Sequence, residues 1–162
     1  MNKIHSFFLY ILKYALQGEK ITTAPSFTIT EWEQLIQLSQ QHHVLPLVFE
    51  TVHSIPEFQQ LPCYAFLRNQ IRAQVMVQVQ KTLDFQSLYQ FLSSKNLHPV
   101  VVKGLICRNL YPYPDHRISS DEDLLILPDQ IDLYHEYLTQ YGLSAPASFS
   151  KEGGILWRNL IN

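Results

Sequence analysis

The sequence predicts an α+β protein, with a helical N-terminal half followed by a small mixed β-sheet that helices flank. Residues 1–95 carry their apolar residues at helical spacing. The pattern changes at "KNLHP", after which come a β-branched triplet at 100–102 and the apolar run "DLLIL" at 123–127. We therefore expect two regions, a helical one over 1–95 and an α/β core over 96–162.

The first helix is expected within the first 16 residues, where the apolar residues fall on one helical face. These residues are Ile4, Phe7, Phe8, Ile11, Leu12 and Ala15. Lys13 interrupts the run and no small-residue cleavage site follows, so we do not expect a signal peptide. The run is also too short to cross a bilayer.

A capping box is expected to open the second helix. Thr30 and Glu33 match the pattern T-x-x-E, which predicts a helix over 31–42 with Trp32 and Leu35 facing inward. Pro46 is placed to begin a further short helix, because proline is favoured in the first turn.

The segment 63–94 contains neither glycine nor proline. Its apolar residues step by four, which predicts one long helix or two abutting ones. They are Leu67, Ile71, Val75, Val79 and Leu83. Six glutamines, which are good helix formers, are expected on its solvent side. They are Gln70, Gln74, Gln78, Gln80, Gln86 and Gln90.

The α/β core is expected to begin after Asn96 and Pro99, which end the long helix. Residues 100–102 predict a short buried strand, "LICRNLY" one or two helical turns, "YPYPDH" a loop and "DLLIL" a second strand. A helix over about 129–141 follows and ends at Gly142. "ASFS" and "ILWRNLI" are ambiguous, and both are compatible with strands joined by a turn at Gly153 and Gly154.

Composition excludes some classes of partner. The net charge is −2 without a long run of one sign, so neither extended nucleic-acid binding nor a basic membrane patch is expected. Cys63 and Cys107 lie far apart and outside any C-x-x-C pattern. We therefore expect free thiols and a cytoplasmic location.

Two aspartates stand at the entrance to the second predicted strand. Residues two apart in a strand face the same side, so Asp121 and Asp123 are expected to project together with their Cβ atoms about 7 Å apart. Two carboxylates held this close repel each other, and a divalent cation removes the repulsion. The pair therefore predicts a site for Mg²⁺ or Mn²⁺, whose preferred ligands are carboxylates and phosphates.

A phosphate site is expected beside these aspartates. Gly104 lets the backbone approach an anion, the helix after it offers free N–H groups, and Lys103 supplies a positive charge. Arg117 and Ser119 are further candidates for contacts to a nucleotide. Glu122 points to the opposite face, so we expect it to be exposed or ion-paired.

Each of these residues also has a purely structural interpretation. A D-x-D pair at the edge of a strand can simply be solvated, and Lys103-Gly104 can be an ordinary turn. Arg117 can belong to a surface ion pair. The order and spacing of the residues therefore carry the case for a site.

The stretch "VVVKGLICRNLYPYPDHRISSDEDLLIL" resembles the polymerase-beta-like nucleotidyltransferase superfamily, and within it a bacterial branch of uncharacterised nucleotidyltransferases. The resemblance rests on Lys-Gly at 103–104, Tyr-Pro at 111–112, Arg117, and the D-x-D-L-L run at 121–125. It implies a nucleotidyltransferase-like core in which Lys103 and Gly104 bind the nucleotide phosphates. Asp121 and Asp123 would be catalytic and would hold Mg²⁺.

The implied reaction transfers a nucleoside monophosphate from a nucleoside triphosphate to an acceptor hydroxyl of unknown identity. Two residues depart from the superfamily pattern, Leu105 where glycine or serine is preferred and Glu122 where an apolar residue is usual. The superfamily also uses a third carboxylate, for which only Glu152 comes late enough in the chain. Members of the branch are usually longer, so a truncated member is expected.

Two other functions stay open. The first is a catalytically incomplete interaction module whose long glutamine-rich helix binds a partner. The second is a metal-dependent glycosyltransferase that uses D-x-D to hold a sugar-nucleotide. Those folds usually begin with a nucleotide-binding α/β unit, whereas the first strand here is predicted only near residue 100.

Overall fold

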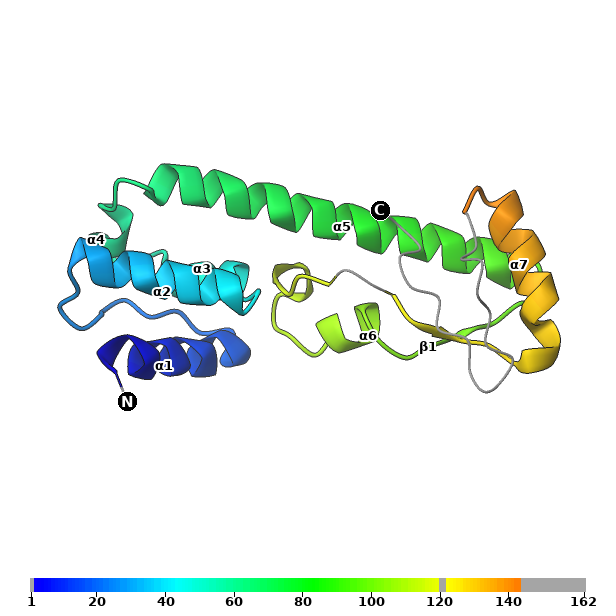
Figure 1. Cartoon of the computed structure of the whole chain (residues 1–162), viewed down its shortest axis with the longest axis horizontal. Coiled ribbons are helices and arrows are strands. Elements are labelled where there is room, and N and C mark those ends of the chain that lie inside the picture. The colour runs from blue at the N-terminus through cyan, green and yellow to red at the C-terminus, as the bar shows by residue number, and fades with distance from the viewer. Residues whose placement is uncertain (1, 120–121, 144–162) are drawn as a thin grey trace. The chain divides into compact units, whose positions relative to one another are not determined.

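The computed structural model describes residues 2–119 and 122–143. The chain divides into two compact units, one made of residues 1–78 with 108–118 and the other of residues 79–107 with those from 119 onward. Helices dominate the described residues and a two-stranded sheet lies in the second unit (Figure 1). The α+β class is therefore confirmed.

Helices form most of the first unit. They are α1 (Lys3–Gln17), α2 (Ile29–Gln41), α3 (Leu45–Val52), α4 (Pro56–Gln59) and the first part of α5 (Tyr64–Ser94). The predicted apolar face of α1 is buried except for Leu12, which is half-buried. Gly18 ends α1 at φ +72°, a left-handed conformation that glycine adopts without steric cost.

The prediction for the start of α2 is wrong by two residues. Thr28 caps the helix, and its backbone N–H donates to Glu31 while the Glu31 N–H donates to the Thr28 hydroxyl. The capping box is therefore formed by the overlapping T-x-x-E pattern of Thr28 and Glu31. The physical reason is the staple around this cap, because Phe27 before it packs on Trp32, with ring centroids 5.1 Å apart. If Thr30 were the cap, polar Gln34 would take the place of Trp32 in this contact, and no staple would form.

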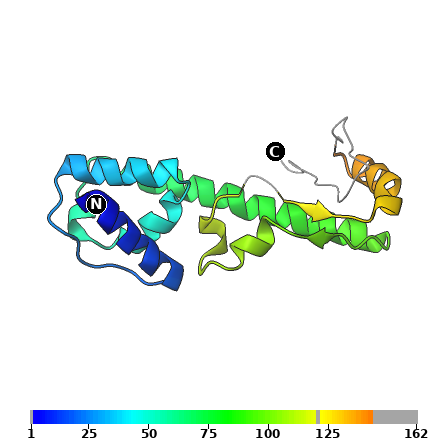
Figure 2. The same cartoon turned by 60° about the horizontal axis from the view of Figure 1, so that its bottom comes forward.

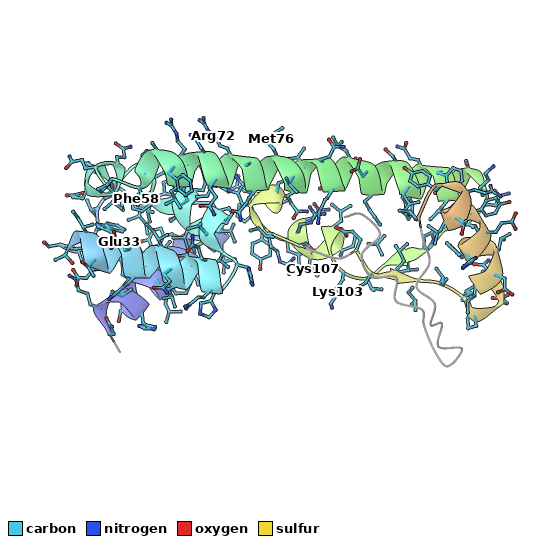
Figure 3. All side chains as sticks on the ribbon, turned by 45° about the horizontal axis from the view of Figure 1, so that its top comes forward. Glu33, Phe58, Arg72, Met76, Lys103 and Cys107 are labelled. Atoms are coloured by element: carbon cyan, nitrogen blue, oxygen red, sulfur yellow. The ribbon has the colours of Figure 1, made fainter. Side chains whose placement is uncertain are left out.

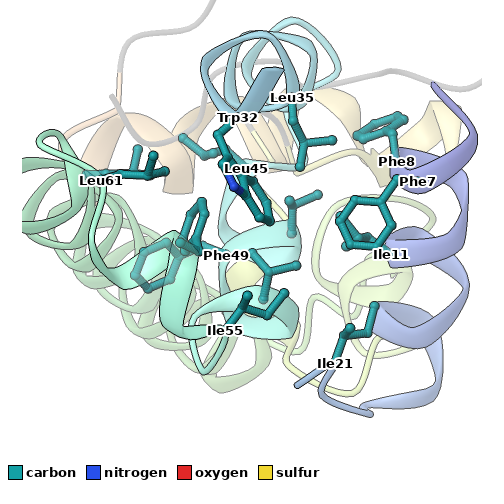
Figure 4. Close-up of a cluster of buried hydrophobic side chains, with 14 of the residues drawn as sticks. Phe7, Phe8, Ile11, Ile21, Trp32, Leu35, Leu45, Phe49, Ile55 and Leu61 are labelled. Atoms are coloured by element: carbon teal, nitrogen blue, oxygen red, sulfur yellow. The ribbon is translucent and has the colours of Figure 1, made fainter. Parts of the chain in front are cut away.

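The core of the first unit is rich in aromatic rings (Figure 4). Trp32 is almost fully buried and its ring centroid lies 5.1 Å from that of Phe58. Phe7 meets Phe27 edge to face at 5.2 Å. These contacts join α1, α2 and α4, and tilted or edge-to-face ring pairs stabilise a core beyond their buried area.

Helix α5 is one continuous helix of 31 residues, and it contributes to both cores. Its buried side repeats every seven residues, through Ile71, Gln78, Phe85 and Leu92. Each step of four residues turns by about 40° more than one full turn of the helix. Side chains spaced by four along a long helix therefore move gradually away from the core face. Leu83, expected inside, is accordingly 51% exposed, and Gln78, expected in solvent, is buried.

The second unit packs two strands and a helix against the later part of α5. Strand β1 (Val100–Val101) and strand β2 (Leu124–Leu125) lie side by side (Figure 2). They pair antiparallel, with Val101 opposite Leu124. The short helix α6 (Leu105–Arg108) begins after β1, η1 (Pro114–His116) follows in the first unit, and η2 (Pro128–Gln130) leads into α7 (Ile131–Gln140). Leu88, Leu92, Leu124, Tyr134 and Leu138 are among the core residues.

The triplet at 100–102 is not a buried strand. Val101 packs on the core, but Val100 is 58% and Val102 44% exposed. The strand pairs antiparallel with β2 and one face of the pair covers the core, so alternate side chains face outward. The expected strands at 147–150 and 155–161 lie outside the described residues.

The described part of the chain contains no helix that is both long and apolar enough to cross a membrane. Cys63 and Cys107 are free thiols, as the sequence predicts.

Candidate functional site

The strand pair brings Lys103 next to Asp123. The Val102 N–H donates to the Asp123 carbonyl oxygen over 3.0 Å, which carries the pairing one residue beyond β1 and β2. The Lys103 Nζ then lies 3.4 Å from Asp123 Oδ2. Figure 3 shows Lys103, whose side chain is 65% exposed, so this ion pair stays accessible to solvent.

The Asp123 carboxylate is buried and only half satisfied. Its side chain is 1% exposed, and Oδ1 has no hydrogen-bond partner. An exposed lysine compensates a buried carboxylate weakly, because water screens the pair. Oδ1 is therefore a buried acceptor that no described residue uses. A carboxylate oxygen is the type of donor that a hard cation such as Mg²⁺ prefers.

Asp121 lies outside the described residues, so the shared face of the two aspartates stays a prediction. Glu152, the candidate third carboxylate, lies outside them as well. Within 2–119 and 122–143, no group of three or more His, Cys, Asp or Glu side chains is placed to hold a metal ion. Asp123 is thus the part of the expected cation site that the structure describes.

Gly104 makes the turn between β1 and α6. It is buried and has φ +62°, a conformation that glycine adopts without the penalty that a Cβ would bring. Helix α6 begins at the next residue, and the Leu105 N–H donates to Glu122 Oε2 over 2.6 Å. The N–H groups of this turn are therefore not all free for a phosphate, contrary to the expectation from the sequence.

Glu122 is a residue whose part in the site the sequence interpretation missed. It was expected to be exposed or ion-paired, yet it is only 8% exposed and accepts the Leu105 hydrogen bond. Unpaired N–H groups at the start of a helix attract a carboxylate, which explains why a charged residue is buried here. One signal in the sequence could have indicated this burial, because Glu122 stands at a position where an apolar residue is usual.

The contacts of Arg117 and Ser119 to a nucleotide stay a prediction. Arg117 belongs to the first unit, where its guanidinium lies over the Tyr111 ring at 5.6 Å from the centroid. The alternative role of Arg117, an ion pair with a carboxylate, is not among the contacts of the described residues. Ser119 is half-buried in the second unit, the unit of Lys103, Gly104 and Asp123.

Arg108 is a second residue that the sequence interpretation passed over. It ends α6, is fully buried, and its Nη1 lies 3.8 Å from Asp115 Oδ1. An arginine is rarely buried without paired charges or hydrogen bonds. No periodicity around residue 108 marks it, so only the tertiary structure reveals its burial.

A comparison with known protein families gives one match. The sequence model of a family described as uncharacterised nucleotidyltransferase matches residues 29–152, which include the Lys-Gly turn and the D-x-D segment. Neither the curated proteins nor the solved structures contain a match to the chain.

Proposed function

Because the chain belongs to this family of uncharacterised nucleotidyltransferases, we propose that it moves a nucleoside monophosphate from a nucleoside triphosphate to an acceptor hydroxyl. In this reaction the acceptor oxygen forms a bond to the α-phosphorus. The bond from that phosphorus to the oxygen bridging to the β-phosphate breaks, and pyrophosphate leaves. The acceptor hydroxyl releases its proton.

The observation that supports this proposal most is the buried Asp123 carboxylate with a free Oδ1 beside Lys103. Asp123, together with Asp121, would hold Mg²⁺, which when bound neutralises phosphate charge and orients the triphosphate. Lys103 is exposed enough to turn from Asp123 toward a phosphate. Gly104 keeps the backbone open at this point because it carries no side chain.

The test compares wild type with Asp123→Asn and Lys103→Gln. Pyrophosphate release is measured with each of the four common ribonucleoside triphosphates in the presence of Mg²⁺ and cell-derived small molecules as acceptors. Binding of the same triphosphates is measured by calorimetry. We expect Asp123→Asn to lower the rate about 100-fold or more, and Lys103→Gln to weaken triphosphate binding about tenfold.

Asp129→Asn serves as the control, because Asp129 is an exposed aspartate of η2 in the same unit. It should behave as wild type. Equal triphosphate binding and equal pyrophosphate release by wild type and Asp123→Asn would contradict the proposal.

A second candidate, an interaction module, is supported by exposed apolar side chains on α5. Phe66, Met76 and Val77 are each more than half exposed. A contiguous exposed apolar surface marks a site where a partner binds. The pyrophosphate assay separates the two candidates, since a module that lacks catalysis releases none with any triphosphate.

A further inference from the structure

The first unit contains a cavity of about 530 Å³ that includes none of the residues assigned to the nucleotidyltransferase site. One wall is aromatic, because Phe49 and Tyr64 stack with ring centroids 5.7 Å apart and ring planes at 27°. Ile71 and Val75 of α5 extend this wall. The volume lies within the range of small-molecule sites, which are mostly apolar with a few placed polar groups.

Two arginines give the cavity a positive side. Arg68 and Arg72 lie one turn apart on α5 and line it, and Figure 3 shows Arg72 beside Met76. Neither guanidinium has a hydrogen bond or an ion pair with any residue that the structure describes. Side chains four apart on a helix point the same way, so both are available to one anion.

The acidic residue of the cavity does not cancel these charges. Glu50 lines it, but Lys20 Nζ lies 3.1 Å from Glu50 Oε1 and balances that carboxylate. The charges of Arg68 and Arg72 therefore remain uncompensated at this site. Charge complementarity favours an anionic ligand.

His116 supplies a polar group to the same cavity. Its ring stacks on Tyr113 with centroids 5.3 Å apart, and its Nδ1 is buried without a hydrogen-bond partner. Burial lowers the pKa of the His116 imidazole below its usual 6.5, which favours the neutral form of the ring. A neutral imidazole offers one donor and one acceptor to a ligand.

We propose that this cavity binds a small organic anion, whose aromatic body lies against Phe49 and Tyr64 and whose phosphate or carboxylate binds Arg68 and Arg72. The aromatic wall alone would favour a neutral ring, and the arginines alone would favour any anion. Their juxtaposition selects a molecule that carries both.

The experiment titrates the full chain with phenyl phosphate and with benzoate, and monitors heat by calorimetry. Inorganic phosphate and benzyl alcohol serve as probes that carry only the anion or only the ring. We expect at least one aromatic anion to bind at millimolar concentration or below. Both partial probes should bind at least tenfold more weakly. The stronger of the two aromatic anions identifies the acidic group that the site prefers.

Single variants decide whether the arginines carry this binding. We expect Arg68→Gln and Arg72→Gln each to weaken binding of the preferred aromatic anion about tenfold, the size expected for one charge-assisted hydrogen bond. Lys13→Gln removes an exposed positive charge of α1 in the same unit and should leave binding unchanged. Circular dichroism checks that every variant is folded.

Three outcomes would overturn the proposal. They are no binding of either aromatic anion at about 5 mM, equal binding of inorganic phosphate, and the same loss in Lys13→Gln as in Arg72→Gln.

Discussion

Glu122 ties the turn after β1 to the segment before β2. Its carboxylate accepts the Leu105 N–H at 2.6 Å in a nearly dry environment, where a hydrogen bond to a charged group is worth more than one in water. The residue therefore holds Gly104 close to the chain that carries Asp123. In the proposed reaction this makes Glu122 a positioning residue.

Replacing Glu122 tests this role. We expect Glu122→Gln to lower the free energy of unfolding by about 1 kcal/mol, because a neutral amide oxygen is a weaker acceptor. Glu122→Ala should lower it by about 2 kcal/mol. Urea unfolding measures the change, and hydrogen exchange at the Leu105 amide should speed up in both variants.

Glu136→Gln is the matched control, because Glu136 is exposed on α7 and bonds only to Gln140 one turn away among the contacts described. It should change stability by less than about 0.5 kcal/mol. Unchanged Leu105 exchange in Glu122→Ala would show that the hydrogen bond does not hold the turn.

Tyr134 makes the second unit sensitive to alkali. Burial, with a smaller contribution from Tyr89, raises the pKa of Tyr134 from 10.0 to about 12. Because the pKa is higher in the folded chain, the unfolded chain loses the proton first. The contribution of Tyr134 to stability is therefore complete below pH 10 and is lost as the pH rises toward 12.

We expect wild type to lose stability more steeply than Tyr134→Phe between pH 10 and 12, in chemical denaturation at a series of pH values. Tyr113→Phe, a change at a more exposed ring in the first unit, should follow wild type. Parallel curves for wild type and Tyr134→Phe would refute the assignment.

At the scale of elements, two capping patterns overlap at the start of α2, and the helix uses one of them. Thr28 and Thr30 each begin a T-x-x-E pattern, but only Thr28 makes the reciprocal hydrogen bonds with Glu31. Lys3 of α1 also pairs with Glu31 at 3.0 Å, so the chosen cap joins two helices. The pKa of Glu31 is lowered by the backbone hydrogen bond at Thr28 first and by Lys3 second.

Thr28→Ala is expected to lower the free energy of unfolding by about 1 kcal/mol, the usual effect of losing an N-cap side chain. Thr30→Ala is the natural control, because it changes the same residue type two positions away and should have little effect or a slight stabilising one. Thermal unfolding of both variants measures the difference. A larger loss in Thr30→Ala would place the helix start two residues later.

The strand pair of β1 and β2 could be buried on one face or on both. The apolar runs at 100–102 and 124–127 are compatible with burial on both faces, but antiparallel pairing covers one face only. Pattern alone does not distinguish a strand buried on two sides from one buried on one side. The difference depends on which elements pack against the sheet.

At the scale of the whole molecule, the described residues form two hydrophobic cores, and α5 contributes to both. Leu35 belongs to the first and Leu88 to the second, and both are completely buried. Stability in such a chain is expected to differ between the units, because each is held by its own contacts.

Leu35→Ala and Leu88→Ala test this division. Each should destabilise the unit that contains it by about 3 kcal/mol, the middle of the range for a buried leucine. Hydrogen exchange followed along the chain should speed up mainly in residues 1–78 for the first variant, and mainly in residues 79–107 and 122–143 for the second. An equal increase in both units would show that the chain unfolds as one cooperative body.

The sequence by itself determined the α+β class, the amphipathic α1, the long α5, the strands near 100 and 124, and the Lys-Gly and D-x-D segments. Each depends on residues close together in the chain, whose spacing sets periodicity, capping and turn formation. The family was also accessible from the sequence, because the order of these short motifs is itself local information.

Only the tertiary structure decided the cap of α2, the exposed face of β1, the burial of Glu122, Gln78 and Arg108, and the free Oδ1 of Asp123. The cavity lined by Arg68 and Arg72 also belongs to this group, since its walls come from α3, α5 and η1. The physical reason is that burial and charge compensation depend on partners distant in the chain. Local propensity specifies which elements form, and packing specifies which of their faces lose contact with water.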